Sequence, residues 1–431
     1  MTVGPVRPWR PSPSHFRAAV IGVVGLAAAL LFRLPSLLVL AAPFAIVAGW
    51  SAATRPIGPP VVSGRLAPST VREGEGTAWT ATWSDADRAD HVIASSPDRL
   101  WIETRPTSGV ETAAVVDGEA SVSVPMRSTR WGHHDVGPIA FVTISSWGAF
   151  RSKGLDGGLR ISTLPLPDRF DATPTRLRAD GLVGLHRSTN PGDGSEFASL
   201  RPFRAGDRLR RINWRRSLRA DALHVTTTYA DQDIHVALIV DALDDFGVSG
   251  GIDGAASSLD TTVRAAGAIA EHFLLGGDRV SLRILGPRRS PNVPPATGSG
   301  HLRRILDVLT SVEPDPSRLP PIRNRLDAVP HGALVVMLSP LVSPTALERA
   351  SSIASHGIGV AVIDTLPDDV HLDDDPVTSL AWRIRLLERR REVRTIQEIG
   401  VPVTRWQCPG SLDPFLRDLV RRAALPRMAR R

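Results

Sequence analysis

The sequence is nearly devoid of cysteine, lysine and tyrosine. Among its 431 residues, Cys408 is the only cysteine, Lys153 is the only lysine, and there is one tyrosine. A single cysteine excludes an intrachain disulfide and a zinc site built from cysteines, and it favours a reducing compartment. Nearly every cation is therefore an arginine. Because Ala, Gly, Pro and Arg all abound, as in GC-rich coding genomes, the arginine excess is weaker evidence of function than in an average protein.

Motifs that carry enzymatic chemistry are also missing. The chain has no Walker A motif, no HExxH, no Gly-x-Ser-x-Gly and no dinucleotide-binding glycine fingerprint. We therefore expect no enzymatic activity and no required cofactor. The formal net charge of +7 favours acidic partners in general. The length predicts two or three structural units.

Two apolar stretches near the amino terminus predict a membrane hairpin. Residues 18–32 carry no polar side chain, and residues 34–53 carry no charge. One helix over both would be about 54 Å long, whereas a bilayer core is about 30 Å thick, so we expect two helices that turn at 33–36. A cleaved signal peptide with its apolar core at 18–31 is the alternative. Arginines on both sides of the hairpin place both of its ends in the cytoplasm: Arg7, Arg10, Arg17 and Arg55.

The next segment, residues 60–165, has the pattern of a small antiparallel β-sandwich. Short runs alternate apolar and polar residues between Gly, Pro and Asp, at 77–83, 91–96, 120–126 and 139–146. His133 and His134 are adjacent, so in a strand they point to opposite faces and do not jointly bind one metal. We expect the tryptophans of this segment to serve packing: Trp79, Trp83, Trp101 and Trp131.

From residue 234 onward, apolar strands alternate with amphipathic helices. We expect strands at 234–243, 279–286, 332–341, 358–366 and 401–407, and helices at 257–277, 301–312, 343–357, 379–399 and 413–424. This alternation predicts right-handed crossovers and a doubly wound α/β sheet. Ligands of such sheets bind beyond the carboxyl ends of the strands. The positions to inspect are therefore 241–245, 339–341 and Asp364.

The expected organisation is multidomain. Residues 1–55 form a basic tail and a two-helix membrane hairpin, and 60–165 form the β-sandwich-like module. Residues 166–233 form a connecting segment, and 234–431 form the α/β domain with basic carboxyl-terminal helices.

The connecting segment contains a long and specific signature at 193–225, DGSEFASLRPFRAGDRLRRINWRRSLRADALHV. It resembles the pattern Glu-Phe, Leu-Arg-aromatic-x-x-Gly-Asp, Arg-x-Ile-x-Trp and a later Leu-x-Val. The positions that match are Glu196, Phe197, Arg201, Gly206, Asp207, Arg211, Ile212 and Trp214. Through this signature and the order of its segments, the chain resembles membrane-anchored proteins that carry the domain of unknown function 58.

The resemblance implies more about fold and partners. Members of that family contain a von Willebrand factor A-like fold, and they are typically encoded beside MoxR-type AAA+ ATPases. They are thought to work with these ATPases as assembly or chaperone-like systems at the membrane. The resemblance therefore implies a von Willebrand factor A-like α/β domain and a MoxR-type partner.

It also raises the question of a metal site. Domains of this kind often hold Mg²⁺ through Asp-x-Ser-x-Ser, a distant Thr and a second Asp, and hard oxygen ligands suit that ion. Here Leu243 takes the place of one Ser, and Pro340 sits where the second Asp would be. The candidate ligands that remain are Asp241, Asp245, Thr297 and Ser299. The alternative is that Asp241 ends a strand and binds backbone or an Arg.

The signature is rich in arginine, with eight Arg and one acid in residues 201–219. One interpretation is structural: Asp207 accepts hydrogen bonds, the Trp214 ring is buried and Arg211 pairs with an acid. The other is an interaction surface for an acidic partner or anionic lipid. The candidates for partner binding are Glu196, Arg201, Gly206, Asp207, Arg211 and Trp214. A second basic stretch lies at 381–400, where Leu380, Ile384 and Leu387 are expected to form a packing stripe.

These observations favour a two-pass cell-membrane protein with its soluble domains in the cytoplasm. We expect an interaction scaffold or adaptor that works with a MoxR-type ATPase in assembly or maturation of client proteins. The alternatives are a binder of anionic lipid or nucleic acid through the arginine-rich segments, and an uncharacterised enzyme. Nucleic acid is not the expected partner, because the arginines lack the interleaved aromatics of a single-strand platform.

Overall fold

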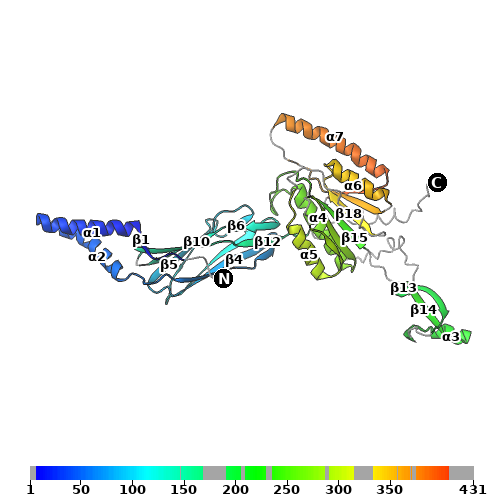
Figure 1. The fold of residues 1–431 in the computed structure, drawn as a ribbon, viewed down its shortest axis with the longest axis horizontal. Helices are drawn as coiled ribbons and strands as arrows, with labels where there is room; N and C mark the ends of the chain where they lie inside the picture. The colour runs from blue at the N-terminus through cyan, green and yellow to red at the C-terminus, as the bar shows by residue number, and fades with distance from the viewer. Residues whose placement is uncertain are drawn as a thin grey trace. The chain divides into compact units, whose positions relative to one another are not determined.

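The structure is a computed structural model. It describes residues 6–145, 147–167, 191–204, 209–229, 235–286, 291–314, 333–356, 358–368, 370 and 375–406. The chain forms two compact units (Figure 1). The N-terminal unit comprises Met1–Leu166 and Gly251–Gly254, and the C-terminal unit comprises Pro167–Gly250 and Ala255–Arg431. The split at Leu166 adjoins the boundary expected at 165.

The two predicted apolar helices are present as α1 (Pro13–Phe32) and α2 (Pro35–Ala53). The Ser12 hydroxyl caps α1 by accepting the His15 N–H at 3.2 Å. Arg33 ends α1 in the left-handed region, with φ of 57°, and the chain re-enters a helix at Pro35. Both helices are long and apolar enough to cross a membrane, each with a mean hydropathy of 1.9.

Antiparallel sheets make up most of the rest of the N-terminal unit. The four-stranded sheet has the order β2-β4-β8-β6, with bounds Val61–Ala67, Gly76–Ser84, Ala120–Ser128 and Ile102–Thr104. The five-stranded sheet has the order β1-β11-β10-β5-β7, with bounds Arg10–Pro11, Phe150–Asp156, Ile139–Ser145, Ala89–Ser95 and Val110–Ala114. A smaller sheet has the order β3-β12-β9, with bounds Thr70–Arg72, Arg160–Leu164 and Gly132–Asp135.

A single core joins the two larger sheets. Along β4 buried and exposed residues alternate, and the inward residues include Trp79 and Trp83, which are 0% and 1% exposed. Each indole N–H finds a partner on the opposite sheet, Asp156 at 2.7 Å for Trp79 and Thr143 at 3.1 Å for Trp83. The predicted packing role of these two tryptophans is confirmed, and the shared core is that of a sandwich.

The two adjacent histidines of β9 have separate partners. His133 Nδ1 lies 3.1 Å from the Ser162 hydroxyl, and His134 Nε2 lies 2.6 Å from the Arg130 carbonyl oxygen. His133 is exposed and His134 is half-buried, as expected for neighbours on opposite faces of a strand.

The N-terminal unit also includes the short segment Gly251–Gly254. The Ile252 N–H donates to the Thr129 carbonyl oxygen at 2.7 Å. The Arg127 guanidinium binds both carboxylate oxygens of Asp253, at 2.6 and 3.2 Å. This bidentate pair holds the segment against β8.

The C-terminal unit is built on a six-stranded sheet of order β17-β16-β15-β18-β19-β20. The bounds are Val293–Ala296, Arg279–Leu285, His235–Asp241, Leu334–Ser339, Gly359–Asp364 and Val403–Arg405. All neighbouring strands are parallel except β17, which pairs antiparallel with β16. Strands β15 and β18 are almost entirely buried, as continuous apolar runs in a parallel sheet are.

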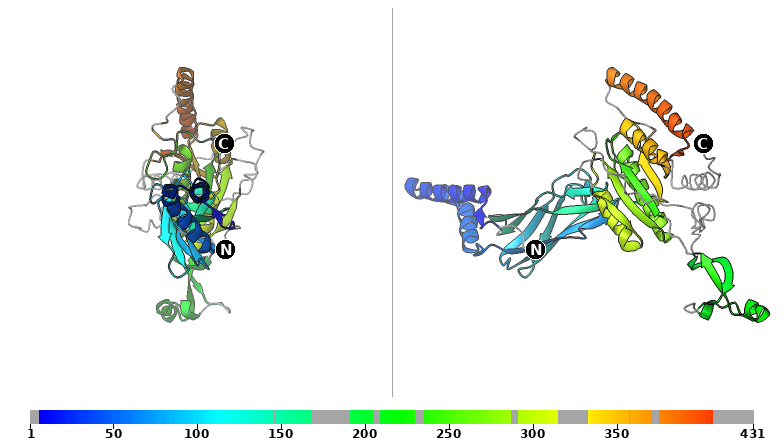
Figure 2. Two further views of the ribbon diagram at one scale, coloured as in Figure 1. Left: turned by 90° about the vertical axis from the view of Figure 1, so that its left-hand side faces the viewer. Right: turned by 45° about the vertical axis from the view of Figure 1, so that its right-hand side comes forward.

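Four helices connect these strands: α4 (Ser258–Leu275), α5 (Ser299–Thr310), α6 (Pro344–Ser355) and α7 (Pro376–Glu398). Helix α6 packs on the face of the sheet that carries Ala237, Ile239 and Met337, and α7 lies beside α6 (Figure 2). Ser257 and Asp260 form a capping box at the start of α4. The strand-helix alternation was therefore predicted correctly up to β20, whereas β17 was not foreseen and the helix expected at 413–424 lies outside the described residues.

Between the two main sheets in sequence lies an antiparallel pair, β13 (Pro191–Pro202) and β14 (His224–Tyr229). A 3₁₀ turn, η1 (Leu209–Arg211), and a short helix, α3 (Trp214–Ala220), connect the two strands. We call these elements together the signature arm, because they contain the sequence signature.

Candidate functional site

The signature arm is held together by one buried hydroxyl, that of Ser217. Its Oγ donates to the Asn213 carbonyl oxygen at 2.8 Å and accepts the His224 N–H at 2.9 Å. The Asn213 side chain caps α3 by accepting the Arg216 N–H at 3.1 Å. Ile212 and Val225 form a β-bridge and are both buried. These contacts fix α3 against β14, so that the side chains of the helix are presented from a defined frame.

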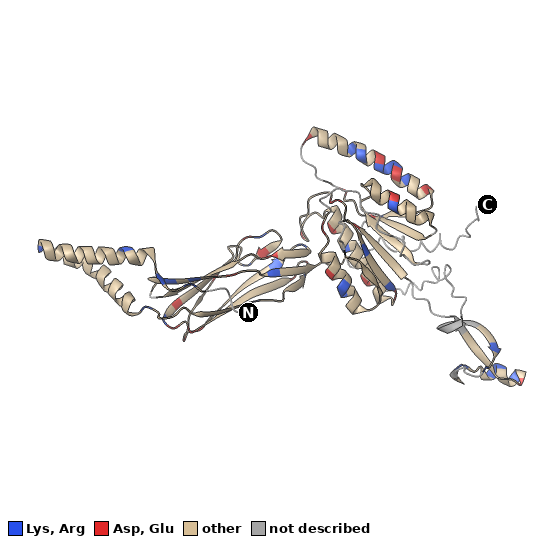
Figure 3. Ribbon diagram, viewed as in Figure 1, with Lys and Arg blue, Asp and Glu red and all other residues tan. Residues whose placement is uncertain are grey.

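The outer surface of the arm is apolar and basic at once. Trp214 and Leu218 are 62% and 83% exposed, and because they are four residues apart they share one face of α3. Leu209 and Leu223 are also exposed. Figure 3 shows basic positions along the arm. The exposed arginines among them are Arg204, Arg215, Arg216 and Arg219. The interpretation in which the Trp214 ring is buried is wrong for this structure, because most of that side chain is exposed.

The structure describes some of the other signature candidates fully, one by its backbone alone and two not at all. Arg201 is in β13, paired with Val225, and its guanidinium donates to the Pro202 carbonyl oxygen at 3.2 Å. Arg211 ends η1 and is half-buried. Glu196 lies in residues 191–198 of β13, for which the structure describes only the backbone. Gly206 and Asp207 lie outside the described residues.

The second candidate region is the carboxyl edge of the six-stranded sheet, where Asp241 ends β15. The residue is 2% exposed, and both of its carboxylate oxygens accept hydrogen bonds. Oδ1 accepts the Leu243 N–H at 3.1 Å, and Oδ2 accepts the Ser339 hydroxyl at 2.5 Å. Burial raises the pKa of Asp241 to about 6, although both hydrogen bonds favour the ionised form.

Asp245 is also used within the fold. Its Oδ1 accepts the Ser258 hydroxyl at 3.2 Å and the Leu259 N–H at 2.9 Å, at the first turn of α4. A carboxylate at a helix amino terminus stabilises the helix through its unpaired N–H groups and its dipole. Asp245 therefore serves as a helix-capping group.

Thr297 and Ser299 are not brought to Asp241. Both follow β17, whose last residue, Ala296, pairs with Val280 near the amino end of β16. Asp241 pairs with Leu285 at the carboxyl end of the same strand. Five residues of β16 separate the two levels, or roughly 16 Å at strand spacing. The antiparallel direction of β17, which the sequence pattern did not reveal, puts these hydroxyls at the opposite edge.

These placements decide the fit of a Mg²⁺ ion to the candidate ligands. Asp241 and Asp245 are hydrogen-bonded within the fold, and Thr297 and Ser299 are remote. Leu243 and Pro340 supply no side-chain oxygen. Within the described ranges, no group of three or more His, Cys, Asp or Glu residues is arranged to hold a metal. The residues present do not fit an octahedral site of hard oxygen ligands.

The loop after β18 is held instead by two arginines of α7. The Arg385 Nε donates to the Val342 carbonyl oxygen at 2.8 Å, and the Arg389 Nε donates to that of Pro340 at 2.9 Å. Arg389 Nη2 also lies 2.5 Å from Asp364 Oδ1, an ion pair between side chains that are 11% and 16% exposed. Sequence reasoning missed this clamp, since nothing in the basic run at 381–400 marks these two arginines out from their neighbours.

The same loop has an unusual backbone. Leu341 adopts φ of 54°, in the left-handed region that non-glycine residues rarely use. Its N–H donates to the Ser339 hydroxyl at 2.9 Å, and its side chain is buried. Pro340, where the second Asp ligand was sought, therefore belongs to a tight turn. The Ser339 hydroxyl and the two arginines of α7 hold this turn in place.

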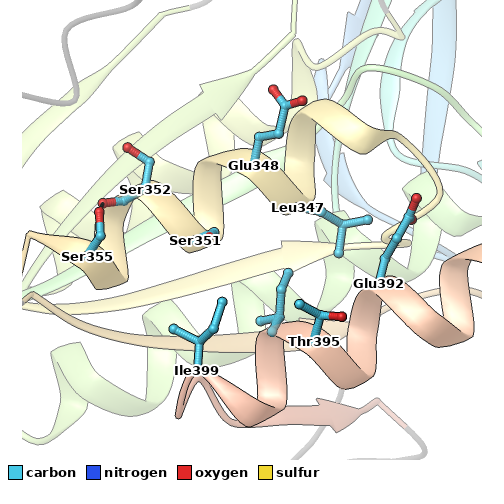
Figure 4. A pocket seen from close by; sticks show the side chains of 9 residues that line it. Leu347, Glu348, Ser351, Ser352, Ser355, Glu392, Thr395 and Ile399 are labelled. Carbon is cyan, nitrogen blue, oxygen red and sulfur yellow. Dashed lines mark hydrogen bonds between the residues drawn. The ribbon is translucent and has the colours of Figure 1, made fainter.

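A shallow groove of about 530 Å³ runs between α6 and α7 (Figure 4). Its apolar residues are Leu347, Ile396 and Ile399, and its polar ones are Glu348, Ser351, Ser352, Ser355, Glu392 and Thr395. The carboxylate of Glu392 receives the Arg385 guanidinium at 3.1 and 2.7 Å. In the described part of the chain, no hydrogen bond joins a hydroxyl of the groove to a carboxylate. The groove therefore lacks the arrangement of a hydroxyl nucleophile bound to a general base.

Comparison with known proteins places a family match on the arm and the sheet. Two similar proteins are the uncharacterized protein Mb1516 of Mycobacterium bovis and the uncharacterized protein Rv1480 of Mycobacterium tuberculosis. Each is 28% identical over 208 residues, which cover 46% of this chain and 64% of the relative. The chain thus spans less than two thirds of the length of the curated relatives it matches. Residues 199–380, from the end of β13 into α7, match the family described as "Protein of unknown function DUF58".

Proposed function

We propose that the protein is a membrane-tethered interaction scaffold that works with a MoxR-type AAA+ ATPase in the assembly or maturation of client proteins at the cell membrane. In this proposal α1 and α2 cross the membrane, and the β-sheets of the N-terminal unit and the whole C-terminal unit lie on the cytoplasmic side. The length and apolarity of the two helices support the tether. The arginines before α1 and after α2 support the orientation.

The proposal includes a von Willebrand factor A-like identity for the C-terminal unit. In its support, β15 lies in the middle of the sheet with β16 on one side and β18 on the other, and an antiparallel edge strand follows β16. The match of residues 199–380 to a family of unknown function agrees with a domain that spans the arm and the sheet.

The observation that carries the proposal is the exposed apolar and basic face of α3. Trp and Arg are the residues that most often dominate the energy of protein interfaces, especially where an aromatic anchor is rigidly held. Here Trp214 and Leu218 stand out from a helix that Ser217 and Asn213 fix in place. The flanking arginines favour an acidic partner surface. A monomer that buries nothing on this face leaves a large aromatic in water.

The proposed docking needs no metal. In von Willebrand factor A-like domains a bound ion is completed by an acid from the partner, but the candidate ligands here do not fit such an ion. The scaffold would therefore recognise its partner through side chains of the arm, and chelators are expected to leave that recognition unchanged.

The test measures binding of a purified MoxR-type ATPase to the full chain in lipid nanodiscs. Trp214→Ala is expected to weaken binding at least about 30-fold, the scale of an interface hot spot. The matched control is Trp147→Ala, because Trp147 is 89% exposed but belongs to the N-terminal unit. Equal affinities for the wild type and both variants would reject the arm as the docking site, and absence of any binding by the wild type would reject the ATPase partnership.

A further inference from the structure

Helix α7 packs against its own domain with a mixed face. That face holds the clamp arginines, Arg385 and Arg389, which bind the loop after β18, and Val393, which packs against the core of the sheet. Of its apolar residues, Ile396 in the last turns is the one that is fully buried. Trp382 contacts Phe246, with ring centroids 5.3 Å apart. The helix is thus attached by the two arginines and by apolar contacts of Trp382, Val393 and Ile396.

The outer face of α7 carries a second set of apolar residues. Val377, Leu380, Ile384 and Leu387 are 73%, 59%, 50% and 59% exposed. Their spacing of three, four and three residues places them in one stripe along the helix. We call these four residues the outer stripe. The packing role expected for Leu380, Ile384 and Leu387 is therefore wrong in this structure, because the clamp arginines occupy the face toward the sheet.

A row of arginines runs along one side of the outer stripe, and one further arginine lies at the carboxyl-terminal end of the stripe. At 100° per residue, Arg383, Arg390 and Arg394 fall on one flank, and Arg391 continues the line of the stripe itself. All four are exposed. On the other flank, Glu388, which lies 3.4 Å from Arg385, contributes one negative charge against the positive charges of these four arginines. The stripe is therefore bordered by net positive charge.

This combination matches a lipid surface better than a partner helix. An interfacial helix buries a narrow apolar face at the level of the headgroups, while arginines beside it meet anionic phosphates. A coiled-coil partner would need apolar residues to continue at the next two stripe positions, but those positions hold Arg391 and Arg394. A lipid surface is also the nearest available occupant for a domain tethered by α1 and α2, because tethering raises its effective concentration.

We propose that the outer stripe and the arginine row of α7 dock the C-terminal unit on an anionic lipid surface. This inference uses the membrane tether of the proposed function, but it does not depend on the ATPase partner. In it, Val377, Leu380, Ile384 and Leu387 enter the headgroup boundary, and Arg383, Arg390 and Arg394 bind lipid phosphates.

A fluorescent probe on the helix tests the proposal in the full chain. In a Cys408→Ser background, Ala381→Cys places one environment-sensitive label beside the outer stripe without altering it, since Ala381 is exposed. Ser352→Cys, on the exposed part of α6, provides the control site. The protein is reconstituted into phosphatidylcholine vesicles with or without phosphatidylserine, and nitroxide lipids serve as quenchers.

We expect the label at 381 to be quenched in the phosphatidylserine vesicles and the label at 352 to remain unquenched. Arg383→Gln, Arg390→Gln and Arg394→Gln together are expected to weaken docking by about fivefold per arginine near an anionic surface, and to abolish the difference between the two vesicle types. The double substitution Leu380→Gln and Leu387→Gln is expected to abolish quenching of the label at 381 in both vesicle types. Flotation of the same samples shows separately whether the hairpin is inserted.

Three outcomes would overturn the inference. Protein that floats with its label at 381 unquenched would reject lipid docking and leave the tether standing. A label that shifts to the blue without lipid quenching would assign the outer stripe to a protein surface, either a second copy or residues 407–431. Protein that fails to float would reject the tether of the proposed function, and the lipid docking with it.

Discussion

Ser339 donates its hydroxyl hydrogen to Asp241 across 2.5 Å and so joins the carboxyl ends of two neighbouring strands, β15 and β18. The same oxygen accepts the Leu341 N–H, which fixes the turn that follows β18. A buried carboxylate, a hydroxyl and a left-handed turn thereby form one unit at the edge of the sheet where the ligands of α/β domains usually bind. In this chain the polar side chains at that edge, Asp241 and Ser339, bind each other and the backbone of the following turn.

Ionisation of Asp241 should make the fold less stable as the pH rises. Its pKa is about 6 in the folded chain and 3.8 for the ordinary group, because burial disfavours the charged form. Below the lower value the carboxyl is protonated in both states and has no effect. Stability is lost as the pH rises between the two values, by up to about 3 kcal/mol for a shift of about two units.

The variant Asp241→Asn isolates this effect, because an amide does not titrate. Its stability relative to the wild type should increase between about pH 3.8 and about pH 6. Pulse proteolysis over a urea series measures the free energy of unfolding of both proteins, each as the detergent-solubilised chain. A constant difference between the two proteins over this range would contradict the burial argument.

Removal of the Ser339 hydroxyl should destabilise the C-terminal unit. Ser339→Ala leaves Asp241 Oδ2 and the Leu341 N–H without their partner, which is expected to cost about 2–3 kcal/mol. It should also raise the pKa of Asp241 further, since that hydrogen bond favours the ionised form. Ser352→Ala on the exposed side of α6 is the control and should change stability by less than about 0.5 kcal/mol. Equal effects of the two substitutions, measured by urea unfolding, would show that the hydroxyl is not a structural link.

The clamp by α7 should be worth far more than a surface ion pair. Arg389→Ala removes the donor to Pro340 and leaves the shielded Asp364 carboxylate without its cation, and we expect a cost of about 2–4 kcal/mol. Arg303→Ala is the matched control. Arg303 also pairs with an aspartate, at 3.1 Å, but both side chains are more than half exposed, and a loss of about 0.5 kcal/mol or less is expected. If thermal unfolding shows the two variants to be equally stable, the clamp does not hold the loop.

Close packing of the hairpin should depend on Gly25. A Cβ at this position would lie 2.6 Å from the Ala41 Cβ, so the two helices approach over small residues, as membrane helices often do. Gly25→Leu is expected to separate α1 from α2 and to abolish cross-linking by a short bifunctional thiol reagent between His15→Cys and Ser51→Cys in a Cys408→Ser chain, since the His15 ring and the Ser51 hydroxyl lie 3.2 Å apart.

The control for that experiment is Gly49→Leu in α2. No atom lies within 4 Å of a Cβ built there, so the larger side chain should leave cross-linking unchanged. Undiminished cross-linking in the Gly25→Leu chain would mean that the helices do not pack through this position.

Most of the secondary structure was predictable because it rests on local patterns. The continuous apolar run at β15 requires a buried strand, Ser257 with Asp260 starts α4, and Pro35 after Arg33 divides the hairpin. Each signal lies within a few residues of its effect. The edge strand β17 was not predicted, because it is four residues long and contains two prolines. Such a segment has no alternation of apolar and polar residues.

The candidate sites were less predictable, since their geometry depends on distant partners. Thr297 follows a strand whose direction is set by pairing with β16, and that direction alone moves it to the wrong edge for Asp241. Trp214 was equally compatible with a core or a surface until α3 was oriented by Ser217 and Asn213.

The sequence by itself determined the apolar hairpin, the β-rich module, the alternating strands and helices, and the arginine-rich signature, because composition and periodicity act over short distances along the chain. Only the tertiary structure decided which face of α7 meets the sheet. Arg385 and Arg389 find the carbonyl oxygens of Val342 and Pro340 more than forty residues away, and this contact turns Leu380, Ile384 and Leu387 outward. The helix carries apolar residues on two sides, and the rest of the domain selects the side of Trp382, Val393 and Ile396, which no local pattern shows.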